Sequence, residues 1–209
     1  VITEYEILKR LEQYPVPEEE EFLWQMDIRM NAYGVRVDEE LINGALAIDA
    51  ISSENLTMEA IDITGLGNPN STSQLKVWIE KQISGEISGL TKENVTELLS
   101  RSDISDEVRR VLEIRQQLGK TSIKKYVAMK TAEGEGERVR GLTQFYGANR
   151  TGRWAGRLIQ MQNLPQNHLI DLEEARWLVH DGDFAALELL YDNIPAVLSQ
   201  LIRTAFVPK

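Results

Sequence analysis

The sequence predicts a mostly helical protein with one small antiparallel β element, and three observations support this fold class. Apolar residues recur every three or four positions over most of the 209 residues, which is the spacing of amphipathic helices. Ser, Thr and Asp residues precede these segments, where helix caps are expected. Only the stretch RVRGLTQFYGA, residues 138–148, alternates as a strand does.

The first third of the sequence predicts three helices. In residues 1–13, apolar side chains recur every three positions, as on one face of a helix. Pro17 and the glutamates after it begin a second helix, which Gly34 ends. Asp38 is expected to cap a third, long helix. The second helix carries an apolar stripe formed by Phe22, Leu23, Met26, Met30 and Tyr33.

Two short capped helices and a longer helical stretch follow. Helix starts are expected near Ser71 or Thr72 and at Thr91, and residues 102–130 form the longest helical stretch. Two long helices on either side of two short ones would make an antiparallel stalk with a small tip. The hydroxyl-rich helix N-termini of such a tip suit phosphate oxygens, although ordinary N-capping explains the same residues.

The C-terminal part predicts two or three further helices, over residues 171–182, 183–192 and 195–206. His180, Asp181 and Asp183 resemble a metal cluster only superficially, because the sequence has two histidines and no cysteine to complete it. We interpret them as a helix end followed by a turn at Gly182. Trp154 stays open between a core and a stacking role, and the other three tryptophans are interpreted as core residues: Trp24, Trp78 and Trp177.

Composition limits the class of protein. Hydrophobic residues make up 42% of the sequence, which is enough for a buried core. No apolar run approaches the roughly 18 residues of a membrane span, and the charged N-terminus differs from a signal peptide. The absence of cysteine excludes disulfides and thiolate metal sites and fits a reducing compartment. Because the sequence does not begin with Met, we expect an excised fragment.

Charge is unevenly distributed along this acidic chain. The net charge is −10, yet residues 1–62 hold 15 acidic and four basic residues, so the remainder is close to neutral. Residues 118–160 hold nine basic and three acidic residues. Since phosphate binding depends on a local basic surface, this distribution leaves a nucleic-acid partner open.

The stretch ANRTGRWAGRLIQMQNLP, residues 148–165, combines cations, glycines and amides. Glycine lets the main chain approach another backbone closely, and an arginine after such a turn could probe the minor groove, whose acceptors are nearly the same for every base pair. The amides suit sugar and base edges. The alternative is a salt-bridged loop packed on the acidic half. The stretch holds Arg150, Gly152, Arg153, Gly156, Arg157, Gln160, Gln162 and Asn163.

A second basic stretch, KTSIKK, lies at residues 120–125. On a continuous helix Lys120 and Lys124 would share one face with Ser122 between them, and this face could follow a nucleic-acid backbone. The alternative is a solvated last helical turn whose cations complement the helix dipole. The sequence has neither the GxxxxGK[ST] phosphate loop nor a serine in a nucleophile elbow.

Taken in order, these segments resemble the family A DNA polymerases, in particular bacteriophage-type members of the bacterial DNA polymerase I group. The resemblance covers essentially all 209 residues. Its most specific block is TGRWAGRLIQMQNLP, which resembles the TGR…QNLP motif at the edge of the palm. The other blocks are VPEEEEFLWQMDIRMNAYGVRVD (residues 16–38), NPNSTSQLKVWI (68–79), VLEIRQQLGKTSIKKYVAM (111–129) and LIRTAFVP (201–208).

The resemblance implies polymerase thumb helices plus a partial palm. Residues 1–34 would be a helical linker after an exonuclease domain, and residues 35–132 the thumb, with its tip at about 64–101. Residues 133–209 would begin the palm, with a helical insertion at 166–200 that resembles what phage-type members carry. The catalytic aspartates are expected beyond Lys209 and the exonuclease motifs before Val1. The chain would therefore contain no catalytic residue and no metal ligand, and would be inactive alone.

The resemblance also implies DNA contacts. Arg153 would contact the minor groove at the primer terminus, beside Arg150 and Arg157, and Gln162 and Asn163 would line the template and primer path. The thumb would contact the duplex backbone through Lys120, Thr121, Ser122 and Lys124, and its tip through Asn70, Ser71, Thr72, Ser73 and Thr91.

The implied partners follow from the same family. The partner would be primer–template DNA, with a deoxynucleoside triphosphate only when the missing palm and fingers are present. Mg²⁺ would serve the parent enzyme, with none bound to this chain. A monomer without a membrane partner, in the cytoplasm of a bacterial or phage-infected cell, is expected.

Two other classes of function compete with this interpretation. One is a helical interaction or clamp module whose arginines at 150, 153 and 157 are neutralised by the acidic half. The other is a nuclease fragment, which would need three or four acids in one cleft. Pairing of the three arginines with carboxylates would favour the first, and an open basic face with Lys120 and Lys124 would favour a polymerase.

Overall fold

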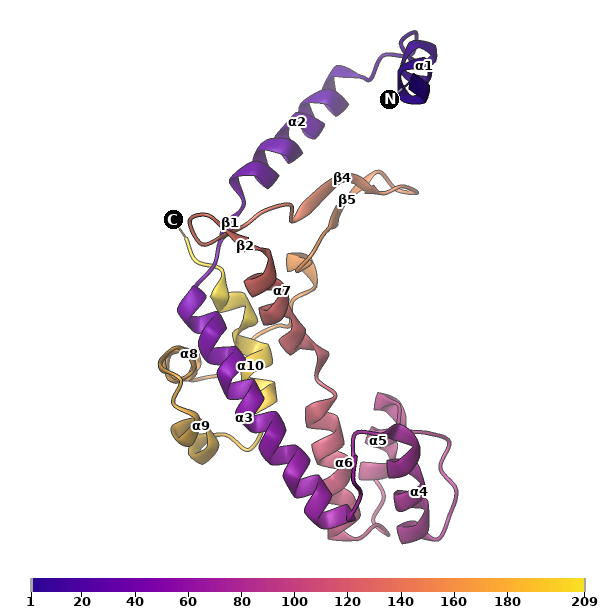
Figure 1. The fold of residues 1–209 in the computed structure, drawn as a ribbon, viewed down its shortest axis with the longest axis vertical. Helices are drawn as coiled ribbons and strands as arrows, with labels where there is room; N and C mark the ends of the chain where they lie inside the picture. Colours follow the sequence, from indigo (N-terminus) through magenta and orange to yellow (C-terminus); the bar gives the residue numbers. More distant parts are fainter. Residues whose placement is uncertain (1, 209) are drawn as a thin grey trace. The chain divides into compact units, whose positions relative to one another are not determined.

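The structure, a computed structural model, describes residues 2–208. It confirms a mostly α-helical fold with small antiparallel β elements (Figure 1). Val1 and Lys209, the positions at which the resemblance places the ends of the thumb and palm segment, lie outside the described residues.

The chain divides into two compact units, and each is built from two separate stretches of sequence. The hairpin unit contains the described residues up to Arg36 together with Ala132–Asn163. The stalk unit contains Val37–Thr131 together with the described residues from Leu164 onwards. The chain therefore passes between the units three times.

A long helix is the main element of the stalk unit. This helix, α3 (Glu39–Thr64), begins where the sequence predicts, because the Asp38 Oδ1 atom accepts a hydrogen bond of 3.0 Å from the Leu41 backbone N–H. It ends at Gly65, whose left-handed backbone (φ 67°) ordinary side chains rarely adopt. The local cap and stop signals thus fix the length of α3.

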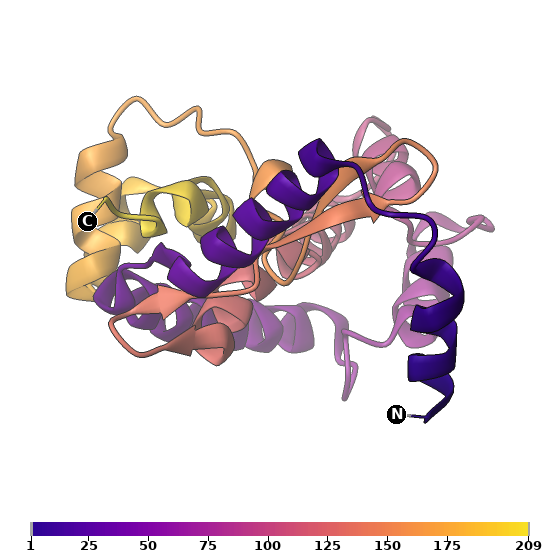
Figure 2. The same cartoon turned by 90° about the horizontal axis from the view of Figure 1, so that it is seen from above.

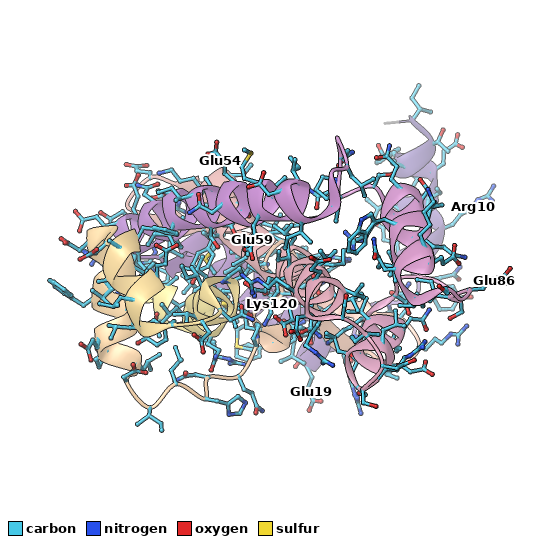
Figure 3. The ribbon with its side chains drawn as sticks, turned by 90° about the horizontal axis from the view of Figure 1, so that it is seen from below. Arg10, Glu19, Glu54, Glu59, Glu86 and Lys120 are labelled. Carbon is cyan, nitrogen blue, oxygen red and sulfur yellow. The ribbon has the colours of Figure 1, made fainter. Side chains whose placement is uncertain are left out.

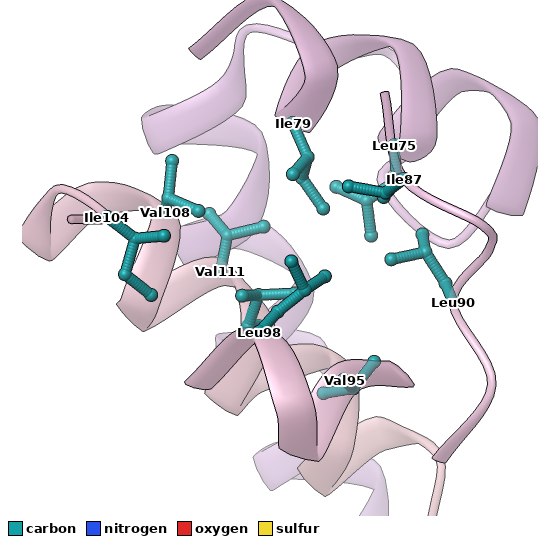
Figure 4. Packing of buried hydrophobic residues seen from close by; sticks show 10 residues of the cluster. Leu75, Ile79, Ile87, Leu90, Val95, Leu98, Ile104, Val108 and Val111 are labelled. Carbon is teal, nitrogen blue, oxygen red and sulfur yellow. The ribbon is translucent and has the colours of Figure 1, made fainter. Parts of the chain in front are cut away.

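Two short helices at one end of α3 form the tip of the stalk unit around their own hydrophobic cluster (Figure 4). They are α4 (Thr72–Ile83) and α5 (Lys92–Leu99), and both pack on α6 (Asp106–Leu118), which runs beside α3. Trp78 is partly buried against the cluster, as expected of a core residue. The cluster consists of Leu75, Ile79, Ile87, Leu90, Val95, Leu98, Ile104, Val108, Val111 and Leu112.

The helical stretch predicted at residues 102–130 is interrupted. After α6, Lys120 is extended (φ −70°, ψ 101°), and a 3₁₀ turn, η1 (Thr121–Ile123), leads into α7 (Lys124–Ala132). Gly119 is a poor helix former. Tertiary contacts hold the break, because Ser122 Oγ donates to Ser199 Oγ at 2.8 Å and the buried Tyr126 hydroxyl donates to a backbone carbonyl at 2.8 Å.

The C-terminal helices are α8 (Leu172–Asp181), α9 (Phe184–Leu190), α10 (Ile194–Leu201) and the 3₁₀ turn η3 (Ile202–Ala205). They pack on α3 or on one another: α8, α10 and η3 contact α3, and α9 contacts α8 (Figures 1 and 2). Gly44 of α3 permits the closest approach, since a Cβ there would lie 1.9 Å from the Val179 carbonyl oxygen of α8. Gly182 ends α8 in the left-handed conformation, as predicted.

The two ends of the stalk unit's sequence meet beside the start of α3. The Asp38 backbone N–H donates to the Ala205 carbonyl at 2.8 Å, and Val37 forms an isolated antiparallel bridge with Phe206. Arg176 of α8 forms an ion pair with the Asp38 carboxylate. The N-terminal cap of α3 is therefore held by residues from the far end of the sequence.

The hairpin unit contains two helices and two small sheets. The helices are α1 (Ile2–Leu11) and α2 (Glu18–Tyr33). One sheet has the order β1 (Val35–Arg36), β3 (Arg138–Val139), β2 (Glu133–Gly134), and the other pairs β4 (Thr143–Ala148) with β5 (Arg153–Gly156); all pairs are antiparallel. The strand predicted at 138–148 thus divides between the sheets, interrupted at Gly141 (φ 70°).

Helix α2 contacts β4 through polar side chains. Thr143 Oγ1 donates to Asp27 Oδ1 at 2.6 Å, and the Thr143 backbone N–H donates to Asn31 Oδ1 at 3.0 Å. Much of the apolar stripe of α2 is exposed, including Phe22 and Tyr33. The expectation that Trp24 and Trp177 are core residues is wrong, because the two residues are 48% and 60% exposed.

Candidate nucleic-acid interface

The strands β4 and β5 form a two-stranded ribbon that carries the glycine–arginine stretch (Figures 1 and 2). Its turn spans residues 149–152, where the backbone N–H groups of Thr151 and Gly152 both donate to the Ala148 carbonyl, at 2.9 and 3.0 Å. Gly152 adopts φ 65°, a conformation that favours glycine. The sequence NRTG therefore closes the hairpin and places Arg153 at the start of β5.

The three arginines of this stretch are all exposed. Arg150 lies in the turn, Arg153 begins β5, and Arg157 follows its last residue. Among the described residues of the hairpin unit, no carboxylate forms an ion pair with any of these guanidinium groups. The neutralisation that the interaction-module interpretation requires is therefore not found within this unit.

The two predicted amide residues come from one turn after β5. The 3₁₀ turn η2 (Met161–Asn163) holds Gln162 and Asn163, both exposed. The Gln162 amide lies over Gly156, where an added Cβ would be 2.2 Å from its Nε2 atom. Asn163 Nδ2 donates to Gln160 Oε1 at 3.3 Å. The structure thus brings the arginines and amides of the predicted site together on one hairpin and the turn that follows it.

The predicted thumb residues Lys120, Thr121 and Ser122 line a hollow of about 620 Å³ in the stalk unit. Two cations that the sequence analysis did not single out, Lys92 and Arg115, line it as well. Its other lining residues are Leu90, Val95, Gln116, Gly119, Pro165, Asn193 and Ser199, so the lining contains three cations and no carboxylate. We call these twelve residues the basic hollow.

The break between α6 and α7 gives Lys120 its place in the basic hollow; Figure 3 labels this residue. Burial lowers the pKa of the Lys120 ammonium group, and the positive charge of Lys92 lowers it further. Two ammonium groups that repel one another beside a guanidinium group form a site of uncompensated positive charge. Such a site favours an anion, because an anion relieves the repulsion.

The prediction that Lys120 and Lys124 share a helical face is wrong. Lys120 precedes the 3₁₀ turn η1, whereas Lys124 begins α7 and does not line the basic hollow. The Ser122 hydroxyl donates its proton to Ser199, so toward a ligand it offers an acceptor oxygen. A signal for Lys92 existed in the sequence, because it directly follows the predicted cap at Thr91.

The tip residues divide into two kinds. The Thr91 hydroxyl caps α5 by accepting a hydrogen bond of 3.3 Å from the Asn94 backbone N–H, which is ordinary N-capping. Ser71 precedes α4 without forming a side-chain cap, and its hydroxyl lies 3.1 Å from the Ser73 hydroxyl. Thr72 and Ser73 are exposed in the first turn of α4, and Asn70 lies in the exposed turn before it.

The histidine–aspartate stretch at the end of α8 contacts the start of α3. His180 Nε2 lies 2.9 Å from Glu40 Oε2 and 3.8 Å from Asp38 Oδ1. Across residues 2–208, His, Cys, Asp and Glu side chains do not form a group of three that could hold a metal ion. Over the same residues, every helix is too short or too polar to cross a membrane.

Comparison with known proteins gave one informative similarity. The chain is 50% identical over 208 residues to a protein of Bacillus phage SP02 named DNA polymerase. The match covers 100% of this chain but 32% of that relative, so the chain spans about a third of the relative's length. No protein-family model matches the sequence, and no solved structure matches it.

Proposed function

We propose that this chain is the part of a family A, bacteriophage-type DNA polymerase that holds the primer–template duplex. The observation that carries the proposal is the similarity over the whole chain to a phage protein named DNA polymerase. Two structural features support it: the unpaired arginines of the β4–β5 hairpin and the cations of the basic hollow. Both are suited to phosphate and minor-groove contacts, which are independent of sequence.

The proposed division of labour follows the order of the segments. Residues 1–34 are the linker after an exonuclease domain, residues 35–132 the thumb, and residues 133–209 the start of the palm. In this proposal Arg153 contacts the minor groove at the primer terminus, where duplex shape can be checked without reading sequence. Lys120 and Thr121 contact backbone phosphates from the thumb, and the basic hollow adds Lys92 and Arg115.

The parent enzyme would join a nucleotide to the primer. The primer 3′-hydroxyl oxygen attacks the α-phosphorus of a deoxynucleoside triphosphate and gives up its proton to solvent. The new P–O bond forms as the bond between the α-phosphorus and the α–β bridging oxygen breaks, and pyrophosphate leaves. Two Mg²⁺ ions in the parent would stabilise the attacking and leaving oxygens. The described residues contain no carboxylate cluster that fits such ions. We assign DNA binding and positioning to this chain.

Binding of a labelled primer–template duplex across a salt series tests the duplex-holding role. We expect fluorescence anisotropy to report binding whose log K falls with log[salt] at a slope of about −2 to −5, with little sequence preference. An absence of binding at low salt, both by this chain and by the full-length protein, would favour the helical interaction module.

The role of Arg153 needs a separate test in the full-length polymerase. We expect Arg153→Ala to lower the single-turnover rate of nucleotide addition far more than it weakens duplex binding, because its contact would position the primer terminus. Arg29→Ala is a matched control, since Arg29 is an exposed arginine of α2 outside the hairpin. Equal losses in rate and affinity would refute the positioning role.

A further inference from the structure

The strand β4 is irregular opposite Trp154, the residue that follows the arginine we assign to the minor groove. Gln144 pairs with Ala155, and Ala148 pairs with Arg153. Three residues of β4 therefore face one residue of β5, and the register shifts between these pairs. Bulges of this kind redirect a side chain at the cost of ladder hydrogen bonds.

Tyr146 lies in the middle of this bulge in a conformation that few residues other than glycine adopt. Its φ is 53°, in the left-handed region, which is unusual for a bulky residue. The residue is 49% exposed, so full burial does not explain why the strain is tolerated. Strained residues in folded proteins are frequently found at functional sites.

The left-handed conformation places the Tyr146 ring on Gly152. A Cβ added to Gly152 would lie 2.9 Å from the ring atom Cε2, 3.1 Å from Cζ and 3.3 Å from the hydroxyl oxygen. The ring thus covers the backbone of the residue that immediately precedes Arg153. A side chain at position 152 would be excluded both by this contact and by its φ of 65°.

Two further aromatic rings connect Tyr146 to the residue on the other side of Arg153. The Phe145 ring packs edge-on against Tyr146, with centroids 5.9 Å apart, and against Trp154, with centroids 6.4 Å apart. Tyr146 therefore restrains Gly152 directly and Trp154 through Phe145. The residues before and after Arg153 are both held by this aromatic chain, while the guanidinium group is left exposed.

We propose that Tyr146 is a positioning residue for Arg153: its ring fixes the backbone of the hairpin turn so that the guanidinium group meets the primer terminus already oriented. This inference rests on the proposed function, because it assigns a purpose to the geometry around Arg153. It names a residue outside the TGR…QNLP block, on the opposite strand. Preorganisation of this kind favours the rate of the chemical step over affinity for the duplex.

The test is a double-mutant cycle in the full-length polymerase. We expect Tyr146→Leu to lower the single-turnover rate about 10- to 100-fold while the duplex Kd changes less than about twofold. Tyr146→Phe keeps the ring and should restore a rate within about twofold of the wild type. In the Arg153→Ala background, Tyr146→Leu should have little further effect, because the group it positions is absent.

Each other outcome has a distinct meaning. An equal loss from Tyr146→Leu with and without Arg153, or a loss in Kd that matches the loss in rate, overturns the positioning role; the latter indicates direct stacking on DNA. A defective Arg153→Ala enzyme beside an unaffected Tyr146→Leu enzyme overturns this inference alone, whereas an unaffected Arg153→Ala enzyme overturns the proposed function as well. Should Tyr146→Leu fail to fold, Tyr146→Gly removes the ring and also tolerates the left-handed backbone, and the same criteria apply.

Discussion

The side-chain amide of Gln162 occupies the space that a β-carbon on Gly156 would fill. An added Cβ would lie 2.2 Å from Nε2, 2.3 Å from Oε1 and 2.6 Å from Cδ of Gln162. The close approach is possible because Gly156, the last residue of β5, has no side chain. Gly156 therefore determines where the amide of η2 can lie, one residue before Arg157.

Gly156→Ala should displace the Gln162 side chain while leaving the stability of the fold nearly unchanged. The added methyl group meets only the end of a flexible side chain, so we expect the free energy of unfolding to change by no more than about 0.5 kcal/mol. The Gln162 amide would be displaced, and the single-turnover rate of the full-length polymerase should fall about tenfold. Gln162→Ala is the matched variant: if Gly156 acts by placing this amide, the double variant should be no worse than Gln162→Ala alone.

Gly44→Ala should destabilise the stalk unit. Here the obstacle is a backbone atom, the Val179 carbonyl oxygen 1.9 Å from the added Cβ, so helix α8 must move away from α3. We expect a loss of about 1–3 kcal/mol in the free energy of unfolding, measured by urea denaturation. Gly67→Ala is the control, because nothing lies within 4 Å of its Cβ position. Equal stability of the two variants would contradict the close packing of α8 on α3.

The basic hollow should contribute to the salt dependence of duplex binding. If Arg115 and Lys92 each contact a phosphate, Arg115→Ala and Lys92→Ala should each reduce the magnitude of the log K against log[salt] slope by about 1. Lys81→Ala, in the last turn of α4 and outside the hollow, should leave the slope unchanged. A slope that falls equally in all three variants would indicate nonspecific attraction by net charge.

The positive charge of Lys120 should strengthen duplex binding but lower the free energy of unfolding. Its pKa is lowered by burial and by Lys92, so the charged form destabilises the folded state at every pH below the folded-state pKa. Lys120→Met should therefore stabilise the protein at pH 7, by no more than a few tenths of a kcal/mol because solvent screens a partly exposed group.

The stabilisation by Lys120→Met should depend on pH. The stability gained by Lys120→Met should shrink as the pH rises through the folded-state pKa toward the ordinary lysine pKa of 10.5, since wild-type Lys120 then loses its proton. Thermal melts at pH 7 and pH 10 measure the difference, and duplex binding should weaken in the same variant. If Lys120→Met were less stable than the wild type at pH 7, the positive charge of Lys120 would be compensated in the folded protein.

The ion pair between Arg110 and Glu59 should contribute stability above acidic pH. Arg110 Nε and Nη2 donate to the two Glu59 carboxylate oxygens at 2.6 and 2.8 Å, and the Arg110 hydrogen bonds lower the pKa of Glu59. Glu59→Gln should cost about 0.5–1 kcal/mol at pH 7, because both groups are partly exposed.

The sign of the pH dependence follows from the lowered pKa. The contribution of Glu59 is complete above the ordinary glutamate pKa of 4.5 and is lost as the pH falls through the lowered pKa of the folded state. Unfolding curves of wild type and Glu59→Gln should therefore converge in acid. Glu54→Gln, on an exposed position of the same helix (Figure 3), is the control and should match the wild type at pH 7. Curves that stay separated in acid would exclude the ion pair as the cause.

Local signals in the sequence were sufficient to predict those helix ends that depend on contacts between neighbouring residues. Asp38 caps α3, Thr91 caps α5, and Gly182 ends α8, because each cap or stop is a contact within a few residues. The break at Gly119 was not predicted. It depends on hydrogen bonds to α10, more than 70 residues away, as the separation of 77 between Ser122 and Ser199 shows.

In the candidate site, too, local features could be predicted from the sequence, whereas contacts between distant residues could not. The hairpin turn before Arg153 followed from Gly152, because a glycine at this place in the sequence indicates a turn. The sequence did not predict that Gln162 packs on Gly156 or that Lys92 and Arg115 line the same hollow, because periodicity carries no information on which side chains meet across elements. A charged residue next to a predicted cap, as Lys92 follows Thr91, is the one local sign that was available.

The threefold passage of the chain between its two units has a consequence for synthesis on the ribosome. Neither unit can finish folding when its first segment leaves the exit tunnel, because each waits for a segment made much later. Arg176, the ion-pair partner of Asp38, lies 138 residues further along the chain. Synthesis of that length takes roughly 7–30 s on the ribosome. During that interval the face of α3 that packs on α8 and α10 lacks its native neighbours. The nascent chain is therefore expected to need chaperone protection, and truncation within residues 164–208 should leave the stalk unit, as well as the C-terminal helices, unfolded.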